Sequence, residues 1–234
     1  AMQMFSEQED LPQSRKEAVV ASNKHPVLIA QYRVGGEFEV DAFSDGNDVC
    51  IPGIMEQIER SGVHSGDSIA VYPPQHLSQE IIETLTDYTR EIAKAMNVKG
   101  LVNIQFIVVK DKVYVIEVNP RASRTVPFMS KITGINMVEY ATRIALGESL
   151  KDTGLPLGLV PDKGYVAIKA PVFSFSKLGL VEIKLGPEMK STGEVMGIGH
   201  TYQEALYKAV VAAHLTVPAG GNVLITVSDR DKPE

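Results

Sequence analysis

The sequence predicts an α+β fold in which helices pack on an antiparallel sheet. Residues 101–109 and 113–119 are apolar runs of strand length separated by a tight turn. Residues 37–43 alternate between polar and apolar side chains, and residues 79–96 carry an apolar stripe at helical spacing. The length of 234 residues allows one large domain or two small ones.

The composition limits the classes of function. The chain is 44% hydrophobic and 22% charged, as ordinary globular proteins are, and its net charge of −6 argues against binding to nucleic acid or anionic membranes. The one cysteine, Cys50, excludes an internal disulfide and a cysteine metal cage, and we expect it to be a small core residue. No apolar run is long enough to cross a bilayer and residues 1–25 are too polar for a signal peptide, so we expect a cytoplasmic protein.

The first part of the chain predicts a short helix and a strand hairpin. The helix is expected over residues 12–21, and a strand over residues 26–32 (PVLIAQY). Residues 35–36 (GG) would turn the chain into a half-buried strand over residues 37–43. Residues 45–48 (DGND) form a natural hairpin tip.

Caps and apolar stripes predict the helices of the middle part. Ser78 caps a helix over residues 79–96. The apolar stripe of this helix consists of Ile81, Leu85, Tyr88, Ile92 and Met96. Two shorter helices are predicted over residues 125–133 and 137–146, each ended by a glycine.

The following segment is predicted to change from loop to strand. Residues 150–164 are rich in glycine and proline and predict a loop, and residues 165–173 predict a strand. Lys169 and Lys184 are candidate anion contacts, but lysines are usually exposed and solubilising, so we leave both out of the predicted site.

The last part of the chain contains a glycine-rich segment and a capped helix. Residues 192–199 lack the spacing of a P-loop or of a dinucleotide-binding turn. Residues 201–204 (TYQE) form a capping box that opens a helix to about residue 215. Residues 218–221 read as a linker, and residues 222–227 as a strand with no partner left in the chain.

Polar side chains interrupt the two apolar segments of the central hairpin. Gln105 lies in the first segment, and Glu117 and Asn119 share one face of the second. A turn at residues 111–112 would bring Gln105 close to Glu117. One carboxylate and two amide oxygens suit a cation such as Mg²⁺ that is held partly by phosphate oxygens.

Two arginines, Arg121 and Arg124, follow the hairpin directly, and guanidinium groups match phosphate and carboxylate oxygens. A single glutamate on a strand is more often solvated than functional. The neighbours of Glu117 in VYVIEVNP are apolar, however, and predict a buried strand of the parallel type. A buried carboxylate is costly unless a metal or an arginine compensates it. Together these residues predict a site for a magnesium nucleoside triphosphate.

The hairpin segment QF-(x)10-EVNPRASR resembles the metal-binding signature of the ATP-grasp superfamily. The stretches 61–68 (SGVHSGDS), 117–134 (EVNPRASRTVPFMSKITG) and 186–199 (GPEMKSTGEVMGIG) resemble the large subunit of carbamoyl phosphate synthetases. That subunit carries two homologous ATP-grasp halves, and this chain resembles the C-terminal half, which phosphorylates carbamate. The resemblance covers essentially the whole chain and implies the C-terminal subdomain of an ATP-grasp module.

The resemblance implies residues that contact the nucleotide. Gln31 and Arg33 belong to a segment that would run along the adenine, and Glu37 would accept hydrogen bonds from the ribose hydroxyls. Glu39 and Asp41 share a face with Glu37, which leaves open which acid has this role. Further nucleotide contacts, largely through backbone groups, are implied for Gly62, Val63, His64 and Ser65.

The resemblance also implies the roles of the hairpin residues. Gln105 and Glu117 would contact both the nucleotide and the divalent ions, Mg²⁺ or Mn²⁺, and Asn119 would be a third metal ligand. Arg121 would neutralise charge on the transferred phosphoryl group, and Arg124 would face the carbamate.

The activity implied by the resemblance is the ATP-dependent phosphorylation of carbamate, derived from bicarbonate, to carbamoyl phosphate, for arginine or pyrimidine biosynthesis. A small glutaminase subunit would be the partner. Residues 1–217 would form a partial ATP-grasp domain with its trailing segment, and residues 218–234 a linker and the first strand of a truncated allosteric domain.

The family's glycine-rich phosphate loop would precede residue 1. We therefore expect the isolated chain to show no turnover and to bind Mg-ATP no more tightly than about 1 mM. Two alternatives stay open: another ATP-grasp ligase such as a biotin carboxylase, or a non-catalytic nucleotide-binding or structural fragment.

Overall fold

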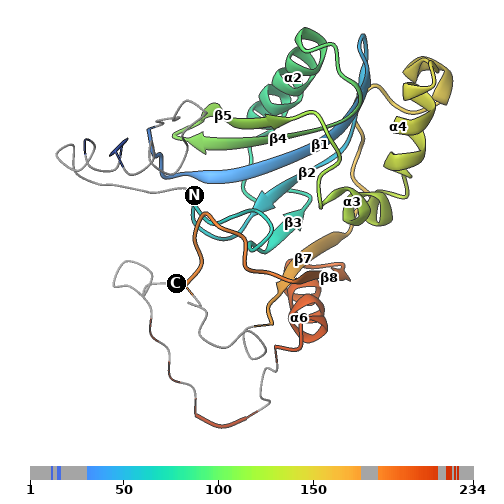
Figure 1. Cartoon of the computed structure of the whole chain (residues 1–234). Helices are drawn as coiled ribbons and strands as arrows, with labels where there is room; N and C mark the ends of the chain where they lie inside the picture. The colour runs from blue at the N-terminus through green and yellow to red at the C-terminus, as the bar shows by residue number, and fades with distance from the viewer. Residues whose placement is uncertain are drawn as a thin grey trace.

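A computed structural model of the chain describes residues 31–174, 184–215 and 220–222, together with positions 12, 15, 16, 224 and 226. In this part of the chain, the strands form one eight-stranded sheet with the order β5-β4-β1-β2-β3-β7-β8, and the short β6 pairs with β2 (Figure 1). The pairs along that order are antiparallel. The predicted α+β class, an antiparallel sheet with packed helices, is confirmed.

The centre of the sheet is the hairpin of β1 (Gly36–Asp45) and β2 (Val49–Gln57). Its tip is the predicted turn, in which Asp45 Oδ1 accepts hydrogen bonds from the backbone of Asn47 and Asp48. The prediction of a half-buried strand is wrong, because β1 lies between β2 and β4 and is buried on both faces.

Two separate apolar clusters cover the two faces of β1. Phe38, Val40 and Ala42 pack in a cluster with Ile81 and Leu85 of α2 (Gln79–Ala95). On the other face, Phe43 packs in a cluster with residues of α3 (Val126–Thr133) and α4 (Met137–Ala145). Cys50 belongs to this second cluster and is fully buried, as predicted, and burial raises the pKa of its thiol to about 12.

β4 (Lys99–Val109) and β5 (Lys112–Asn119) form the second hairpin. Its turn is centred on Lys110 and Asp111, both with positive φ, one residue earlier than predicted. The prediction that the β5 segment is a buried strand of the parallel type is wrong. β5 is an antiparallel edge strand, and its apolar residues Val115 and Ile116 are exposed.

The helices begin where the sequence predicts. The Ser78 hydroxyl accepts a hydrogen bond from Ile81 N at the start of α2, and Gly134 ends α3 in the left-handed conformation. The stripe predicted for α2 is only partly right: Tyr88 and Met96 are exposed, and the inner face is completed by small residues. The buried residues of α2 are Ile81, Leu85, Thr89 and Ala93.

The C-terminal part adds strands to the other edge of the sheet. β3 (Ala70–Tyr72) pairs with both β2 and β7 (Val166–Val172), and β8 (Gly193–Gly199) pairs with β7. The capping box is confirmed in α6 (Tyr202–Ala212), which ends three residues before the predicted end.

The segment predicted as a loop over residues 150–164 contains the 3-10 turn η2 (Leu150–Thr153) and β6 (Gly158–Leu159).

Several predictions fall mostly outside the described residues. These are the helix over residues 12–21, the strand over residues 26–32, the linker over residues 218–221 and the strand over residues 222–227. The described end of the segment predicted as a strand over residues 26–32 is not a strand, because residues 31–34 have no regular structure. The Tyr32 hydroxyl donates a hydrogen bond to Ser61 O. Among the described residues, no helix is long and apolar enough to span a membrane.

Candidate functional site

Two rows of polar side chains cross the three neighbouring strands β1, β4 and β5. In the first row, Glu39 lies opposite Gln105, and Gln105 lies opposite Glu117. In the second row, the order is Asp41, Asn103 and Asn119. The predicted approach of Gln105 to Glu117 is therefore confirmed, and Asn119 Nδ2 donates to Glu117 Oε1 at 2.9 Å.

A register shift in β5 shapes the hairpin part of these rows. The shift falls between Gln105 and Phe106, which face Glu117 and Val115, so Ile116 is an extra residue in β5. Such bulges re-aim side chains at the edges of sheets. Glu117 is exposed, contrary to the expectation of a buried carboxylate, because β5 has no neighbour on its outer side in the described part of the chain.

The hairpin residues fit a divalent ion that is held partly by phosphate. Gln105 donates its Nε2 to Ser65 Oγ at 3.1 Å and Asn119 donates its Nδ2 to Glu117, so the amide oxygens of both remain as acceptors. The described residues contain no group of three histidines, cysteines or acids that could hold a metal by itself. One carboxylate with amide oxygens suits Mg²⁺ when substrate phosphates complete its coordination.

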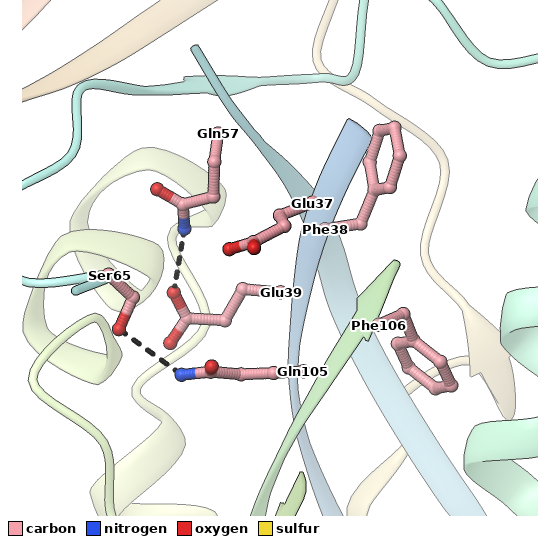
Figure 2. A pocket seen from close by; sticks show the side chains of 7 residues that line it. All are labelled: Glu37, Phe38, Glu39, Gln57, Ser65, Gln105 and Phe106. Carbon is pink, nitrogen blue, oxygen red and sulfur yellow. Dashed lines mark hydrogen bonds between the residues drawn. The ribbon is translucent and has the colours of Figure 1, made fainter. Parts of the chain in front are cut away.

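A small polar pocket lies beside the first row (Figure 2). Glu37, Glu39 and Gln105 point into it, whereas the rings of Phe38 and Phe106 point to the opposite side of the strands. This alternation follows from the two-residue period of a strand. The other lining residues are Gln57 and Ser65.

Three acids on one face of β1, Glu37, Glu39 and Asp41, have different surroundings. Glu37 is half-buried, and its Oε1 accepts a hydrogen bond from Gly62 N at 3.0 Å. Burial raises the pKa of Glu37, and the bond from Gly62 opposes that shift in part. Glu39 and Asp41 are only 4% and 2% exposed and bond to other side chains, so Glu37 is the acid of β1 that a ligand can reach.

The loop of residues 61–68 holds the four predicted nucleotide contacts, Gly62, Val63, His64 and Ser65, all of them half-buried. The His64 ring is engaged within the loop, because its Nδ1 accepts a hydrogen bond from Gly66 N at 3.0 Å.

Residues 186–191 anchor this loop through contacts that the sequence reasoning missed. The buried Asp67 accepts hydrogen bonds from Lys190 N at 2.7 Å and Ser191 N at 2.8 Å, and Ser191 Oγ donates to Gly66 O. The sequence signal for these contacts was the pair of motifs SGVHSGDS and GPEMKSTGEVMGIG. The first motif contains Asp67, and the second contains Lys190 and Ser191.

The expectation that Lys169 is an exposed lysine is wrong. Its side chain is 2% exposed, and its Nζ donates to Ser65 O at 2.8 Å and lies 4.0 Å from Glu194 Oε2. The position on β7 places this cation beneath the loop of residues 61–68. The signal for the burial of Lys169 was its position in the middle of the apolar strand segment VAIKAPV.

The segment of Gln31 and Arg33 lies beside the same loop. Ser61 Oγ donates to Arg33 O at 3.1 Å, and the Arg33 guanidinium stacks 4.2 Å from the centre of the Tyr114 ring on β5. Gln31 Oε1 accepts a hydrogen bond from Arg33 at 3.0 Å. The fold thus brings the predicted adenine segment next to the predicted nucleotide loop.

The two arginines lie on the exposed loop between β5 and α3. Arg121 Nη1 donates to Ala122 O at 3.0 Å, and Arg124 Nη1 contacts Met189 Sδ. Neither guanidinium forms an ion pair with any residue that the structure describes. Both are therefore able to meet an anion from solution.

Comparison with known proteins gives a family match over more than half of the chain. The family described as carbamoyl-phosphate synthase L chain, ATP binding domain matches residues 1–153.

Solved structures with the same fold include several carboxylases. A single-chain, multi-domain long-chain acyl-CoA carboxylase is 20% identical with a TM-score of 0.61, over 86% of this chain and 25% of that one. The biotin carboxylase-β-γ-ATP complex from Campylobacter jejuni is 20% identical with a TM-score of 0.59, over 74% of this chain and 39% of that one. The urea carboxylase from Kluyveromyces lactis is 16% identical with a TM-score of 0.56, over 74% of this chain and 17% of that one.

At these identities the likeness shows the fold alone. The chain spans 34% of the length of a bacterial biotin carboxylase domain and 12% of the K. lactis urea amidolyase, so it corresponds to only a part of either structure.

Proposed function

Because the chain belongs to the carbamoyl-phosphate synthase L chain ATP-binding domain family, we propose that it binds Mg-ATP or Mn-ATP as part of a carbamoyl phosphate synthetase. The reaction proposed for the whole enzyme is the transfer of the γ-phosphoryl group of ATP to carbamate, with a glutaminase subunit as the partner. The observation that carries the proposal is the direct pairing of Gln105 with Glu117, whose free oxygens face the same side as Asn119.

The nucleotide is proposed to lie along the groups that meet at the loop of residues 61–68. Residues 31–34 adjoin this loop through the bonds of Ser61, and Glu37 reaches it through Gly62. A carboxylate has two acceptor oxygens in one plane and can accept from two vicinal hydroxyls. We therefore assign the ribose to Glu37 and the adenine to the segment of Gln31 and Arg33.

The phosphates are proposed to lie over the hairpin. Gln105, Glu117 and Asn119 would hold a divalent ion, which neutralises charge on the phosphate oxygens when bound. The side chains then act by position: Ser65 orients the Gln105 amide, and Asn119 orients the Glu117 carboxylate. Arg121 would stabilise charge on the transferred group, and Arg124 would hold the carbamate carboxylate.

Biotin carboxylation is the alternative that the fold leaves open, because the similar solved structures include biotin carboxylases. Two sequence segments favour carbamate. SGVHSGDS and MKSTGEVMG are expected in carbamoyl phosphate synthetases and not together in biotin carboxylases, and in this chain the two segments bond to each other through Asp67 and Ser191.

Nucleotide binding is tested by titrating the chain with Mg-ATP and monitoring its NMR spectrum. Resonances of residues 31–34, 62–65 and the hairpin should shift, and replacing Mg²⁺ with Mn²⁺ should broaden Gln105, Glu117 and Asn119. Glu117→Gln should weaken binding by about tenfold, because a neutral amide interacts less strongly with a cation. Glu83→Gln, on the exposed face of α2, is the matched control.

A chain that shows no shifts with Mn-ATP or Mg-ATP at 10 mM, roughly ten times the tightest expected Kd of about 1 mM, contradicts the proposal. The substrate is tested by measuring ADP release in a carbamoyl phosphate synthetase large subunit that carries these residues. Carbamate should stimulate the release of ADP there, and Glu117→Gln should lower that rate by about 10². Stimulation by biotin with bicarbonate, and not by carbamate, would assign the chain to biotin carboxylation.

A further inference from the structure

A cluster of buried polar side chains lies beneath the proposed site. Glu39, Asp41, Asn103 and Thr125 are between 2% and 4% exposed, and they come from β1, β4 and the start of α3. Burying polar and charged groups is costly unless hydrogen bonds compensate them. Their arrangement therefore calls for a reason beyond the packing of the core.

Glu39 is the centre of this cluster. Its Oε1 accepts hydrogen bonds from Asn103 Nδ2 at 2.7 Å and from Thr125 Oγ1 at 2.9 Å, and its Oε2 accepts one from Gln57 Nε2 at 3.2 Å. The three donors belong to three separate segments of the chain. The three hydrogen bonds compensate the cost of burying this side chain.

Thr125 makes an unusual use of its hydroxyl. It occupies the N-cap position of α3, where a threonine hydroxyl usually accepts a hydrogen bond from the first turn of the helix. Here no such bond forms, and the hydroxyl donates to Glu39 instead. The contact to the sheet has replaced the helix cap.

Thr125 is also the one buried residue of residues 120–125, which we call the arginine loop because it carries Arg121 and Arg124. Ser123 is half-buried and accepts a hydrogen bond from Thr125 N at 3.1 Å, and the other residues of the loop are exposed. Within this loop, the bond to Glu39 is thus the deepest attachment to the sheet.

We propose that Glu39 is a positioning residue that anchors the arginine loop to the central strand through Thr125. It fixes the start of α3 against β1, so that Arg121 and Arg124 are held beside the Glu117 hairpin. The consequence for phosphoryl transfer rests on the proposed function, whereas the anchor itself does not.

Asp41 is the second acid of the cluster. Asn103 Nδ2 donates both to Glu39 and to Asp41 Oδ1 at 3.0 Å, and Asp41 Oδ2 has no hydrogen-bond partner in the described part of the chain. Burial and the nearby charge of Glu39 raise the pKa of Asp41. Hydrogen bonds of Asp41 with Ser123 and Asn103 and the charge of Lys169 oppose this shift in part, so Ser123 of the arginine loop also contacts the cluster.

The anchor is tested by measuring the backbone hydrogen exchange of the ligand-free chain with mass spectrometry. Thr125→Val keeps the shape of the side chain and removes the donor, and Thr125→Ser keeps the donor. Thr125→Val should raise the exchange of peptides covering 121–128 by about tenfold or more and leave β7, β8 and α6 unchanged. Thr125→Ser should exchange like the wild type, and Glu39→Met, which removes the acceptor, should behave like Thr125→Val.

Exchange at 121–128 that is unchanged in Thr125→Val and Glu39→Met overturns the proposal. So does a rise of equal size in α6, because that would indicate general destabilisation and not the release of one loop. Loss of the anchor in a catalytically complete polypeptide should lower kcat for carbamate and leave KM for ATP unchanged. If exchange at residues 121–128 rises and kcat is unchanged, the bond of Thr125 to Glu39 anchors the loop, but the two arginines do not have the proposed role in phosphoryl transfer.

Discussion

At the scale of single residues, the acids of β1 divide by depth. Glu37 is half-buried beside the loop of residues 61–68, whereas Glu39 and Asp41 lie under the loop that precedes α3. Sequence reasoning left open which of the three would face the ribose, because residues two apart on a strand share a face. The layers that cover β1 distinguish them, and those layers come from distant parts of the chain.

The role proposed for Glu37 predicts a change in nucleotide selectivity. Wild type should bind Mg-ATP more tightly than the 2′,3′-dideoxy analogue, because only ATP offers hydroxyls to the carboxylate. Glu37→Gln retains an acceptor for Gly62 N but loses the charge, and should weaken ATP binding by about tenfold, in line with a charged hydrogen bond of roughly 1.5–3 kcal/mol.

The same titration with the dideoxy analogue gives the control. Glu37→Gln should bind the analogue as the wild type does. An equal loss for both nucleotides would mean that Glu37 supports the loop and does not contact the ribose.

Asp41 predicts a dependence of stability on pH. Burial, followed by the charge of Glu39, raises the pKa of Asp41 from 3.8 to about 7. Between these values the folded chain binds more protons than the unfolded chain, so the contribution of Asp41 to stability falls as the pH rises from about 4 to about 7 and is constant above. Asp41→Asn should remove this part of the decline.

The measurement is the free energy of unfolding in urea at pH 5 and pH 8. The difference between the two pH values should be smaller in Asp41→Asn than in wild type, by up to a few kcal/mol. Acids distant from Asp41 titrate equally in both proteins, so their contributions cancel in the difference. The same pH dependence in both would show that Asp41 is ionised in the folded chain at pH 5.

Residue types alone gave uneven predictions of the site. Gln105, Glu117 and Asn119 were placed correctly relative to one another, because strand periodicity and a tight turn determine their register. Lys169 was misjudged, because the general exposure of lysines says nothing about a strand buried on both faces. Glu117 was expected to be buried, but strand position in the sheet, and not the apolar neighbours, decides its exposure.

At the scale of elements, the contact between β8 and α6 depends on glycine. A Cβ on Gly197 would lie 2.1 Å from Ala205 O and 2.5 Å from Ala209 N, both backbone atoms of α6. The buried residues of α6 are alanines, so the helix can lie close to the strand. Gly197 and Gly199 are therefore explained by their close packing against α6, whereas the sequence patterns showed only that the segment lacks the spacing of a P-loop or a dinucleotide-binding turn.

Gly197→Ala should accordingly destabilise the chain by several kcal/mol, because the backbone of α6 must move to admit the methyl group. Gly193→Ala on the same strand is the matched control, since its Cβ would meet only Val172 Cβ at 3.9 Å. Thermal unfolding of both variants measures the effect. Equal stability of the two would show that α6 does not lie against β8 as described.

Local signals predicted where elements begin better than how deeply they are buried. Ser78, Gly134 and the Thr201 capping box mark the ends of helices through bonds within a few residues. Burial depends on which helices pack over the faces of a strand. The half-buried pattern expected for residues 37–43 failed for this reason, since α2 and α3 cover the two faces of β1.

At the scale of the whole molecule, one short strand connects two parts of the sheet. β3 has three residues and joins the β1–β2 hairpin to β7 and β8, which come about a hundred residues later in the chain. The antiparallel class was predictable from hairpins and alternation. The pairing of β3 with β7 was not, because no local pattern specifies which distant strand completes an edge.

The side chain of Asp67 forms a second connection between these two parts of the sheet. Its carboxylate is fully buried, and its oxygens accept the backbone N–H groups of Lys190 and Ser191. Ser191 Oγ and Lys169 Nζ add bonds to the carbonyls of Gly66 and Ser65. The loop proposed to contact the nucleotide is therefore held from below by residues beyond the matched family region of 1–153.

Asp67→Ala should loosen the nucleotide loop and weaken the junction together. Two buried N–H groups would lose their acceptor, which costs roughly 1–3 kcal/mol for each group left unpaired. Hydrogen exchange should rise in residues 61–68 and in residues 186–191 at once, and Mg-ATP should bind more weakly although Asp67 does not line the pocket. Asp87→Ala, on the exposed face of α2, should change none of these quantities. If exchange rises in residues 186–191 but not in residues 61–68, the C-terminal strands do not support the loop, and its order comes from β1 and β2 alone.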